Sequence, residues 1–453
     1  MLPLPAFLVA NLIEPAYDLY EGSRRLREFR SLMASQWRSW DELQALQSER
    51  LQAMVRHAVD TVPFHARRFA EAGIDPATVR TIDDLAALPL LTKADIRGRQ
   101  QDLLCSRYPR ERLVKAKTGG STGVALEIYC DETGVQRRNA AALRGDHWSG
   151  WRLGQPIAAV WGNPPVPRTW KSKLRRAVKD RYFFLDTMKL DRPAVERFVA
   201  DWRRHRPGLL YGHAHSIFLL AEALHDLGVD DLRPGGIVAT SMMLLQPERR
   251  VIEEVFRRPV TDRYGCEEVS LIGCECEQHR GMHLNSEHTI VEFLRDDGSP
   301  CAPGEDGRIV VTELVNLGMP MLRYEVGDRG APGDGIPCAC GRGLPLMTGL
   351  TGRTADFLVA LDGSRVAGIS LIENTLTRFA GLRQMQLVQD EPDRVVANVV
   401  KGRSYDADTE RQLVAALQGY LGGDGMRVDV VPCERIAQEA NGKYRFAICR
   451  VPR

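Results

Sequence analysis

The sequence predicts an α/β protein: a large layered α/β domain with a β-rich part, followed by a small α+β domain. Three observations support this prediction: the composition, the alternation of helical and strand-like segments, and a change of pattern near residue 356. With 453 residues, 44% of them hydrophobic and 26% charged, the chain can bury sizeable cores.

The overall charge excludes several classes of protein. Lysine and arginine total 61 against 59 acidic residues, a net charge of +2, which argues against a nucleic-acid-binding protein and against a basic membrane-surface protein.

Ten cysteines are too few for a disulfide scaffold. The apolar segment 1–12 lacks the basic start and cleavage site of a signal peptide, and no apolar run is long enough for a membrane span. A reducing cytoplasm is the expected location.

Residues 14–72 carry apolar side chains at three- and four-residue spacing, which predicts helices, and Pro63 interrupts the pattern. Thr92 is suited to begin another helix, because Asp95 falls at the third helical position of a capping box.

From residue 113 the pattern changes. Strand-like segments at 113–116 and 125–129 flank a glycine-rich loop, and residues 137–260 then alternate helical segments with short apolar strands. This alternation is typical of a parallel sheet covered by helices. The predicted strands of this region lie at 157–160, 209–211 and 236–240.

Glycine and proline become more frequent over residues 264–361, where short strands are predicted, for example at 290–295 and 307–313. A new unit then begins, with helices near 369–379 and 406–421 and strands near 384–400 and 426–432. The predicted domains are therefore 1–353 and 354–453, the second being a small lid.

The glycine-rich loop is the first candidate site. Its consecutive glycines let the backbone aim N–H groups at a bulky anion, and its hydroxyl groups add donors. It differs from a Walker loop, since no Gly-Lys-Ser/Thr follows and strands flank it on both sides. The alternative is an ordinary glycine-rich turn. The loop comprises Thr118, Gly119, Gly120, Ser121, Thr122 and Gly123.

Four later segments combine glycine with charged or aromatic residues. Each of them taken alone is also compatible with a turn or a solvated surface. They are Asp262-Arg263-Tyr264-Gly265-Cys266-Glu267-Glu268, Pro320-Met321-Leu322-Arg323-Tyr324-Glu325-Val326-Gly327-Asp328, Gly352-Arg353-Thr354-Ala355-Asp356 and Asn441-Gly442-Lys443-Tyr444-Arg445.

These five segments, in this order and at these separations, resemble the adenylate-forming superfamily of acyl-CoA synthetases and adenylation domains. The segments at 62–65, 85–93 and 338–342 make the chain similar to the phenylacetate–CoA ligase and CapK-type branch. The resemblance extends from about residue 50 to residue 450, nearly the whole chain.

The resemblance implies a role for each matching residue. The loop from Thr118 to Gly123 would hold the ATP phosphates, and Tyr264 with Gly265 would pack on adenine. Glu268 would bind Mg²⁺. The remaining roles would be Asp328 on the ribose, Arg323 and Arg353 near the ribose or α-phosphate, Asp356 as hinge and Lys443 as the catalytic lysine.

Two positions depart from the family pattern. Val124-Ala125 follows the loop where Lys-Pro is frequent, and Glu267 stands where threonine usually precedes the metal-binding glutamate. The resemblance also implies an acyl pocket near the ends of the predicted strands. Its expected residues are Trp161, Tyr211, His213, Thr240 and Ser241.

The cysteines suggest a metal site. Cys276 and His279 in a C-x2-H spacing, with Cys338 and Cys340 in C-x-C, offer four ligands suited to structural Zn²⁺. His283 and Cys274 are alternative ligands, and reduced thiols without a metal are the other interpretation.

The function implied by the resemblance is ATP-dependent activation of a carboxylic acid, aryl or arylacetic, with transfer of the acyl group to CoA. Transfer to an amine is an alternative, and a degenerate nucleotide-binding member is another, although Glu268 and Lys443 are both present. A homodimer is compatible with the sequence. Nucleic acid is not an expected partner, since the basic segment 170–176 is interpreted as an exposed connector.

Overall fold

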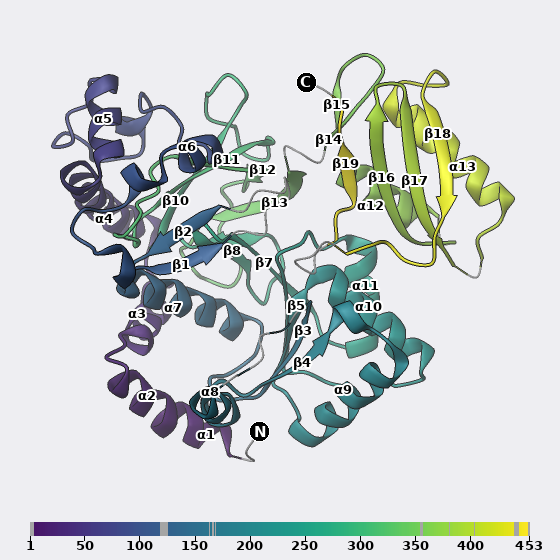
Figure 1. Cartoon of the computed structure of the whole chain (residues 1–453), viewed down its shortest axis with the longest axis horizontal. Helices are drawn as coiled ribbons and strands as arrows, with labels where there is room; N and C mark the ends of the chain where they lie inside the picture. Colours follow the sequence, from purple (N-terminus) through teal and green to yellow (C-terminus); the bar gives the residue numbers. More distant parts are fainter. Residues whose placement is uncertain are drawn as a thin grey trace.

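The fold was analysed in a computed structural model (Figure 1). The structure describes residues 4–117, 126–162, 164, 167, 169–353, 357–379, 381–402, 404–438 and 444–451. Within these ranges, one large sheet organises the first domain, and a smaller separate sheet forms the C-terminal part.

The large sheet has a parallel half and an antiparallel half. Eleven strands from the described residues follow the order β10-β11-β12-β13-β9-β8-β7-β6-β5-β3-β4. The parallel half contains β3 (Ile157–Trp161), β4 (Tyr182–Asp186), β5 (Leu209–His213), β6 (Gly236–Thr240) and β7 (Val260–Cys266). The antiparallel half contains β8 (Ser270–Glu275), β9 (Met282–Leu284), β10 (Thr289–Leu294), β11 (Gly307–Glu313), β12 (Tyr324–Pro332) and β13 (Leu346–Arg353).

Helices cover the parallel strands and bury their apolar side chains. The cluster that they form with β3, β5 and β6 includes Val160, Leu210, Phe218, Ile237 and Phe256, all of which are buried. Because each crossover places a helix on the sheet, both faces become apolar and the strands are nearly continuous hydrophobic runs. The helices of this cluster are α9 (Arg192–His205), α10 (Ala214–Asp226) and α11 (Gln246–Phe256).

The N-terminal third is helical and packs against the antiparallel half. Ser39 begins α4 with a capping box closed by Glu42, and Thr92 begins α6 with the predicted capping box closed by Asp95. The helices of this part are α3 (Arg25–Ser35), α4 (Trp40–Thr61), α5 (Pro63–Ala72), α6 (Lys93–Gly98) and α7 (Glu132–Trp148). The short 3₁₀ turns lie at Asp83–Leu85, Gln100–Leu103, Arg110–Arg112 and Thr187–Lys189.

The end of α3 is attached to segments that come much later in the chain. The Ser35 hydroxyl donates to the buried Glu287 carboxylate at 2.6 Å. The Gln36 side-chain oxygen accepts from the Trp148 indole at 2.8 Å, and the Gln36 carbonyl accepts from the Gly343 N–H at 3.0 Å. These contacts hold the N-terminal helices on the large sheet.

Five short helical pieces and one hairpin complete the described residues of the first part. β1 (Val114–Lys117) and β2 (Glu127–Cys130) form an antiparallel hairpin apart from the large sheet. The chain start is a nearly continuous helix of three pieces, and a further helix pair leans on it. These pieces are α1 (Ala6–Leu8), η1 (Val9–Ile13) and α2 (Glu14–Tyr20), then α8 (Trp170–Arg175) and η5 (Arg176–Asp180).

The C-terminal part has its own sheet, with the order β18-β17-β16-β19, and its own core. Met385, Leu387, Val395, Leu413 and Leu417 are all buried within it. Its elements are β14 (Phe357–Val359), β15 (Arg365–Ala367), α12 (Gly368–Arg378), β16 (Leu382–Glu391), β17 (Arg394–Lys401), α13 (Ala407–Leu421), β18 (Arg427–Pro432) and β19 (Ala447–Cys449).

The predicted fold class is confirmed, since the chain combines a large sheet, layered helices and a small C-terminal α+β unit. The boundary between residues 353 and 354 stays a prediction, and residues 354–356 lie outside the described residues. Among the described residues, every helix is too short or too polar to cross a membrane.

Candidate functional site

The segment around Tyr264 lies where the parallel half of the sheet becomes antiparallel. β7 pairs with β6 in parallel and with β8 in antiparallel fashion, with an irregularity in register at Tyr264 and Gly265. A side chain at Gly265 would place its Cβ 2.4 Å from the Ser270 carbonyl oxygen, so only glycine fits there. The motif is therefore built into a hairpin rather than a solvated turn.

Tyr264 and Asp328 meet across the sheet. The Tyr264 hydroxyl donates a hydrogen bond of 2.9 Å to the Asp328 carboxylate, although 64 residues separate them in the chain. In the ladder of β12 and β13, the backbone of Asp328 stands opposite that of Arg353. Three of the predicted segments thus converge on one part of the sheet.

Glu268 joins the same cluster through a tyrosine of β12. The Tyr324 hydroxyl donates to the buried Glu268 carboxylate at 2.8 Å, and Arg138 donates to the Glu268 backbone carbonyl at 2.7 Å. Arg138 is itself fixed by an ion pair with the buried Glu313. Burial, together with the nearby Glu268 carboxylate, raises the pKa of Tyr324, so its hydroxyl keeps its proton and remains a donor.

Tyr324 is a site residue that was not predicted from the sequence. Side chains four residues apart on a strand point to the same side, so Tyr324 shares a side with Asp328. That spacing is the signal that could have identified Tyr324. Lys93 was also missed as a site residue. A Cβ built on Gly327 would lie 3.3 Å from the Lys93 ammonium nitrogen, so a cation stands beside the Asp328 segment.

The Arg323 side chain is buried and is held by protein groups, and its role at the nucleotide stays a prediction. Its guanidinium forms two hydrogen bonds with the Glu292 carboxylate, of 3.2 and 2.9 Å. It also donates to the carbonyl oxygens of Leu85, Ala86 and Leu88. Its backbone has a left-handed φ of +50°, and its side chain ties the 85–88 loop to the segment before β12.

The predicted acyl-pocket residues lie together at the carboxyl ends of parallel strands. Trp161 ends β3, His213 ends β5 and Thr240 ends β6. The Trp161 ring stacks on Tyr211 with centroids 5.6 Å apart and meets the His213 ring at 3.8 Å. This edge is where open α/β sheets bind ligands. Ser241 follows directly, with a left-handed φ of +65°.

The aromatic cluster of Trp161, Tyr211 and His213 adjoins the cluster of Tyr264, Glu268 and Asp328 through β7. The Thr240 hydroxyl donates to the Arg263 carbonyl at 3.0 Å, and the next residue is Tyr264. The Arg263 guanidinium lies 5.0 Å from the Tyr211 ring centroid and forms an ion pair of 2.8 Å with Asp146. The two clusters are therefore neighbours on the same sheet.

The remaining predicted residues lie outside the described residues. They are the loop Thr118, Gly119, Gly120, Ser121, Thr122 and Gly123, the hinge Asp356 and the lysine Lys443. Their assigned roles, and that of the Arg353 side chain, stay predictions.

The residue after Lys443 packs on the first domain. The Tyr444 ring lies 4.2 Å from the His215 ring, and Phe446 lies 5.0 Å from it. His215 is buried and bonded to the Glu248 carboxylate at 2.5 Å. Leu245, at the start of α11, is buried in the apolar core of the C-terminal part. These contacts seat the C-terminal part against α10 and α11.

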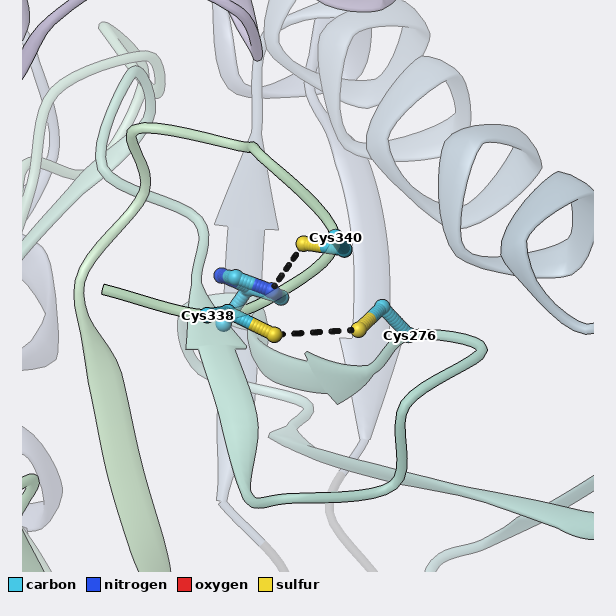
Figure 2. A group of neighbouring side chains, drawn as sticks. Cys276, Cys338 and Cys340 are labelled. Atoms are coloured by element: carbon cyan, nitrogen blue, oxygen red, sulfur yellow. Dashed lines mark hydrogen bonds between the residues drawn. The ribbon is translucent and has the colours of Figure 1, made fainter. Parts of the chain in front are cut away.

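Four possible metal ligands gather between β8, β9 and the loop before β13 (Figure 2). The Sγ atoms of Cys276 and Cys338 are 3.7 Å apart, and the Cys340 Sγ lies 3.2 Å from the His283 Nε2. All four ligand atoms lie within 4.8 Å of one another. A tetrahedral ion with Zn–S bonds of about 2.3 Å would separate its sulfurs by about 3.8 Å, so the set fits zinc.

His283 occupies the place predicted for His279, which corrects that ligand. His279 has a left-handed φ of +49°, and its ring bonds to the Glu275 carboxylate at 3.1 Å. His283 lies on β9, opposite Cys274 in the β8 ladder and Leu346 in the β13 ladder. That pairing brings it beside the Cys338–Cys340 loop, a contact that C-x2-H spacing does not reveal.

The surroundings of the cluster support metal binding. Backbone N–H groups of Gln278 and Arg342 point to the sulfurs of Cys276 and Cys340, each at 3.4 Å. The His283 Nδ1 bonds to the Leu344 carbonyl at 2.8 Å, which leaves Nε2 for a metal. Burial alone would raise the pKa of the Cys340 thiol, but the N–H and side chain of Arg342 lower it below its ordinary value, which favours the thiolate.

The sequence is similar to a known family model and to several characterised proteins. A family model described as the CapK C-terminal domain matches residues 358–450. The phenylacetate–coenzyme A ligase of Thermus thermophilus is 27% identical over 70% of this chain and 72% of its own. Protein CapK of Staphylococcus aureus is 22% identical over 95% of this chain and 92% of its own. The predicted resemblance is confirmed: the chain is similar, over most of its length, to the phenylacetate–CoA ligase and CapK branch of the adenylate-forming superfamily.

Solved structures share the fold of this branch. A 2-hydroxyisobutyryl-CoA ligase in its postadenylation state matches with a TM-score of 0.72 at 20% identity, covering 89% of each chain. An open conformation of that ligase matches with a TM-score of 0.59. An amide bond synthetase from Marinactinospora thermotolerans matches with a TM-score of 0.53 at 17% identity, covering 73% of this chain and 67% of its own.

Proposed function

We propose that this protein is an AMP-forming ligase that joins a carboxylic acid, aryl or arylacetic, to CoA through an acyl-adenylate. The observation that carries the proposal is the convergence of Tyr264, Glu268 and Asp328 beside the aromatic cluster of Trp161, Tyr211 and His213. The named phenylacetate–coenzyme A ligases among its relatives support the same activity.

A carboxylate reacts poorly with nucleophiles, because it is an anion and its oxygen is a poor leaving group. In the first step a carboxylate oxygen attacks the α-phosphorus of ATP, and the bond from that phosphorus to pyrophosphate breaks. Both reactants are anions, so donors and cations must be fixed in place beforehand to offset their repulsion. Lys443 on the C-terminal part, the backbone of the 118–123 loop and Lys93 are the groups proposed for this task.

Mg²⁺, when bound, would neutralise phosphate charge, and the buried Glu268 is its proposed protein ligand. The Tyr324 hydroxyl orients that carboxylate from one side, while the Arg138–Glu313 ion pair fixes its backbone. Tyr264, held by Asp328, would present its ring to adenine, and Asp328 would accept hydrogen bonds from the ribose hydroxyl groups.

The proposed pocket favours planar acids. The rings of Trp161, Tyr211 and His213 would offer flat apolar surfaces, on which an aromatic acid stacks better than a branched aliphatic one. In the second step the CoA sulfur attacks the acyl carbon, AMP leaves, and the thiol proton passes to solvent. A rotation of the C-terminal lid would open the path for CoA.

The experiment is an acid panel incubated with purified protein, ATP and either CoA or amines. AMP release that depends on CoA and on an aromatic acid supports the proposal. Release that requires an amine instead would identify an amide-forming ligase. ATP binding without pyrophosphate release for any acid would indicate a degenerate nucleotide-binding member.

Glu268→Gln is expected to lower acyl-adenylate formation by about a hundredfold, because the amide keeps the Tyr324 hydrogen bond but loses the charge that holds Mg²⁺. Pyrophosphate exchange at several Mg²⁺ concentrations measures the effect. Glu267→Gln is the matched control, since this neighbouring glutamate is exposed and should tolerate the change. Equal losses in the two variants would remove Glu268 from the metal site.

Tyr444→Ala is expected to lower adenylation about tenfold, since the residue next to Lys443 would no longer pack on His215 and Phe446. Formation of acyl-CoA from a supplied acyl-adenylate should change little, because the lid leaves this position in the second step. Tyr420→Ala, at an exposed residue of α13, is the control. An equal loss in both half-reactions would contradict the role of this contact.

A further inference from the structure

The first helix of the chain, formed by α1, η1 and α2, has an unusual distribution of polarity. Its outward side chains recur at three- and four-residue spacing and are almost all apolar. Phe7 is 72% exposed, Leu12 62%, Leu19 85% and Tyr20 82%. Between them the outward face carries Leu8, Asn11 and Ala16.

The inward face of the same helix carries its charges. Glu14 and Asp18 are buried, and both pair with Arg25 at the start of α3. The Leu26 N–H also donates to Asp18, at 2.9 Å. Burial raises the pKa of the Glu14 carboxyl group. An ordinary surface helix has the reverse arrangement, so the outward apolar face needs a partner other than water.

A second element extends this surface. η5 packs against η1, and Arg175 and Lys179 pair with Glu21 at 3.0 and 3.4 Å. In Figure 1, α8 lies beside α1 and α2 at the edge of the molecule near the N-terminus. On α8, Trp170 is 70% exposed and Leu174 is also exposed. We call the exposed apolar side chains of these neighbouring helices together the α2/α8 face.

Cations surround this apolar surface. Within residues 4–25 and 169–181, Arg24, Lys171, Lys173 and Arg175 are exposed, whereas Glu21 is the exposed acid. Lysine is rare in this chain, with nine among 61 basic residues, yet three of the nine lie within residues 169–181. The local charge is therefore positive although the chain as a whole is nearly neutral.

We propose that the α2/α8 face binds the surface of an anionic lipid bilayer, with the first helix lying in the plane of the membrane. Exposed leucine, phenylalanine, tyrosine and tryptophan side chains are suited to the boundary between headgroups and acyl chains. The neighbouring lysines add attraction to anionic headgroups. A protein partner fits less well, because protein interfaces are depleted of lysine.

The test is flotation of the full-length protein with vesicles of phosphatidylcholine alone or mixed with phosphatidylglycerol. We expect the protein to float with the anionic vesicles, and binding to fall with added salt. Leu12→Glu/Leu19→Glu should reduce the partition coefficient about a hundredfold, because two inserting side chains become charged. Lys171→Gln/Lys173→Gln should reduce it about thirtyfold on anionic vesicles only.

The matched control is Ile336→Glu/Tyr420→Glu, which changes two exposed apolar residues elsewhere and should bind as the unaltered protein does. All variants should keep the melting temperature and the ligase activity on a soluble acid, so that this test and the proposed function fail separately. Absence of flotation with anionic vesicles at low salt would overturn the proposal. So would a dimer in solution that Leu12→Glu/Leu19→Glu dissociates, which would make this face a self-association surface.

Discussion

Lys443→Ala is expected to lower acyl-adenylate formation by about a thousandfold while the fold stays intact. The lysine charge is needed where two anions approach each other, so its removal raises the barrier of the first step far more than it weakens binding of either substrate. Pyrophosphate exchange measures the first step, and conversion of a supplied acyl-adenylate to acyl-CoA measures the second. The second step should remain, because its leaving group is already activated.

Lys401→Ala is the matched control for this variant. Lys401 lies in the same C-terminal part, on β17, where it forms an ion pair of 3.3 Å with Glu410 at the surface. An exposed pair of this kind contributes little, so adenylation should be unchanged. Unaltered pyrophosphate exchange in Lys443→Ala would remove this lysine from the mechanism.

His283→Gln is expected to lose a bound equivalent of zinc and to lower the melting temperature by more than about 10 °C. The reason is that a structural zinc site contributes its binding free energy to folding, and the ligand set of Cys276, His283, Cys338 and Cys340 would be broken. Elemental analysis measures the metal and calorimetry the stability. Cys338→Ser should behave in the same way, with acid preference unchanged.

His279→Gln separates the two histidines of this region. His279 bonds to Glu275 instead of joining the cluster, so its replacement should leave the zinc content as it is. Equal zinc loss in the two histidine variants would contradict the ligand set. A wild-type protein without zinc would contradict the metal site itself.

Much of the fold was predictable because its local signals agree with its tertiary contacts. The capping box of Thr92 and Asp95 and the strands near 157–160, 209–211 and 236–240 appear where the sequence places them. Alternation of strand and helix also predicted the layered architecture. The pairing of β9 with β13 left no local signal, and for that reason His279 was chosen over His283.

The candidate site was predictable as a set of segments but not as a set of contacts. Alternation in the 320–328 segment places Tyr324 on the side of Asp328, but it does not reveal that Tyr324 bonds to Glu268 or that Arg323 holds the 85–88 loop. Both contacts join segments that lie far apart in the chain, and the left-handed backbone at Arg323 is likewise not indicated by its residue type. Likewise, the net charge of +2 does not reveal the local excess of cations near α2. This positive surface is recognised only from the packing of η5 against η1 in the structure.

The attachment of α3 has a consequence for biosynthesis. Gln36 contacts Gly343, and Ser35 contacts Glu287, so during translation α3 lacks these partners until about 250 to 300 further residues have been added. Contacts of such sequence separation form slowly and leave apolar surfaces exposed in the meantime. Nascent chains that stop before residue 343 are therefore expected to require chaperones, whereas the later C-terminal unit can assemble around a core drawn almost entirely from its own residues.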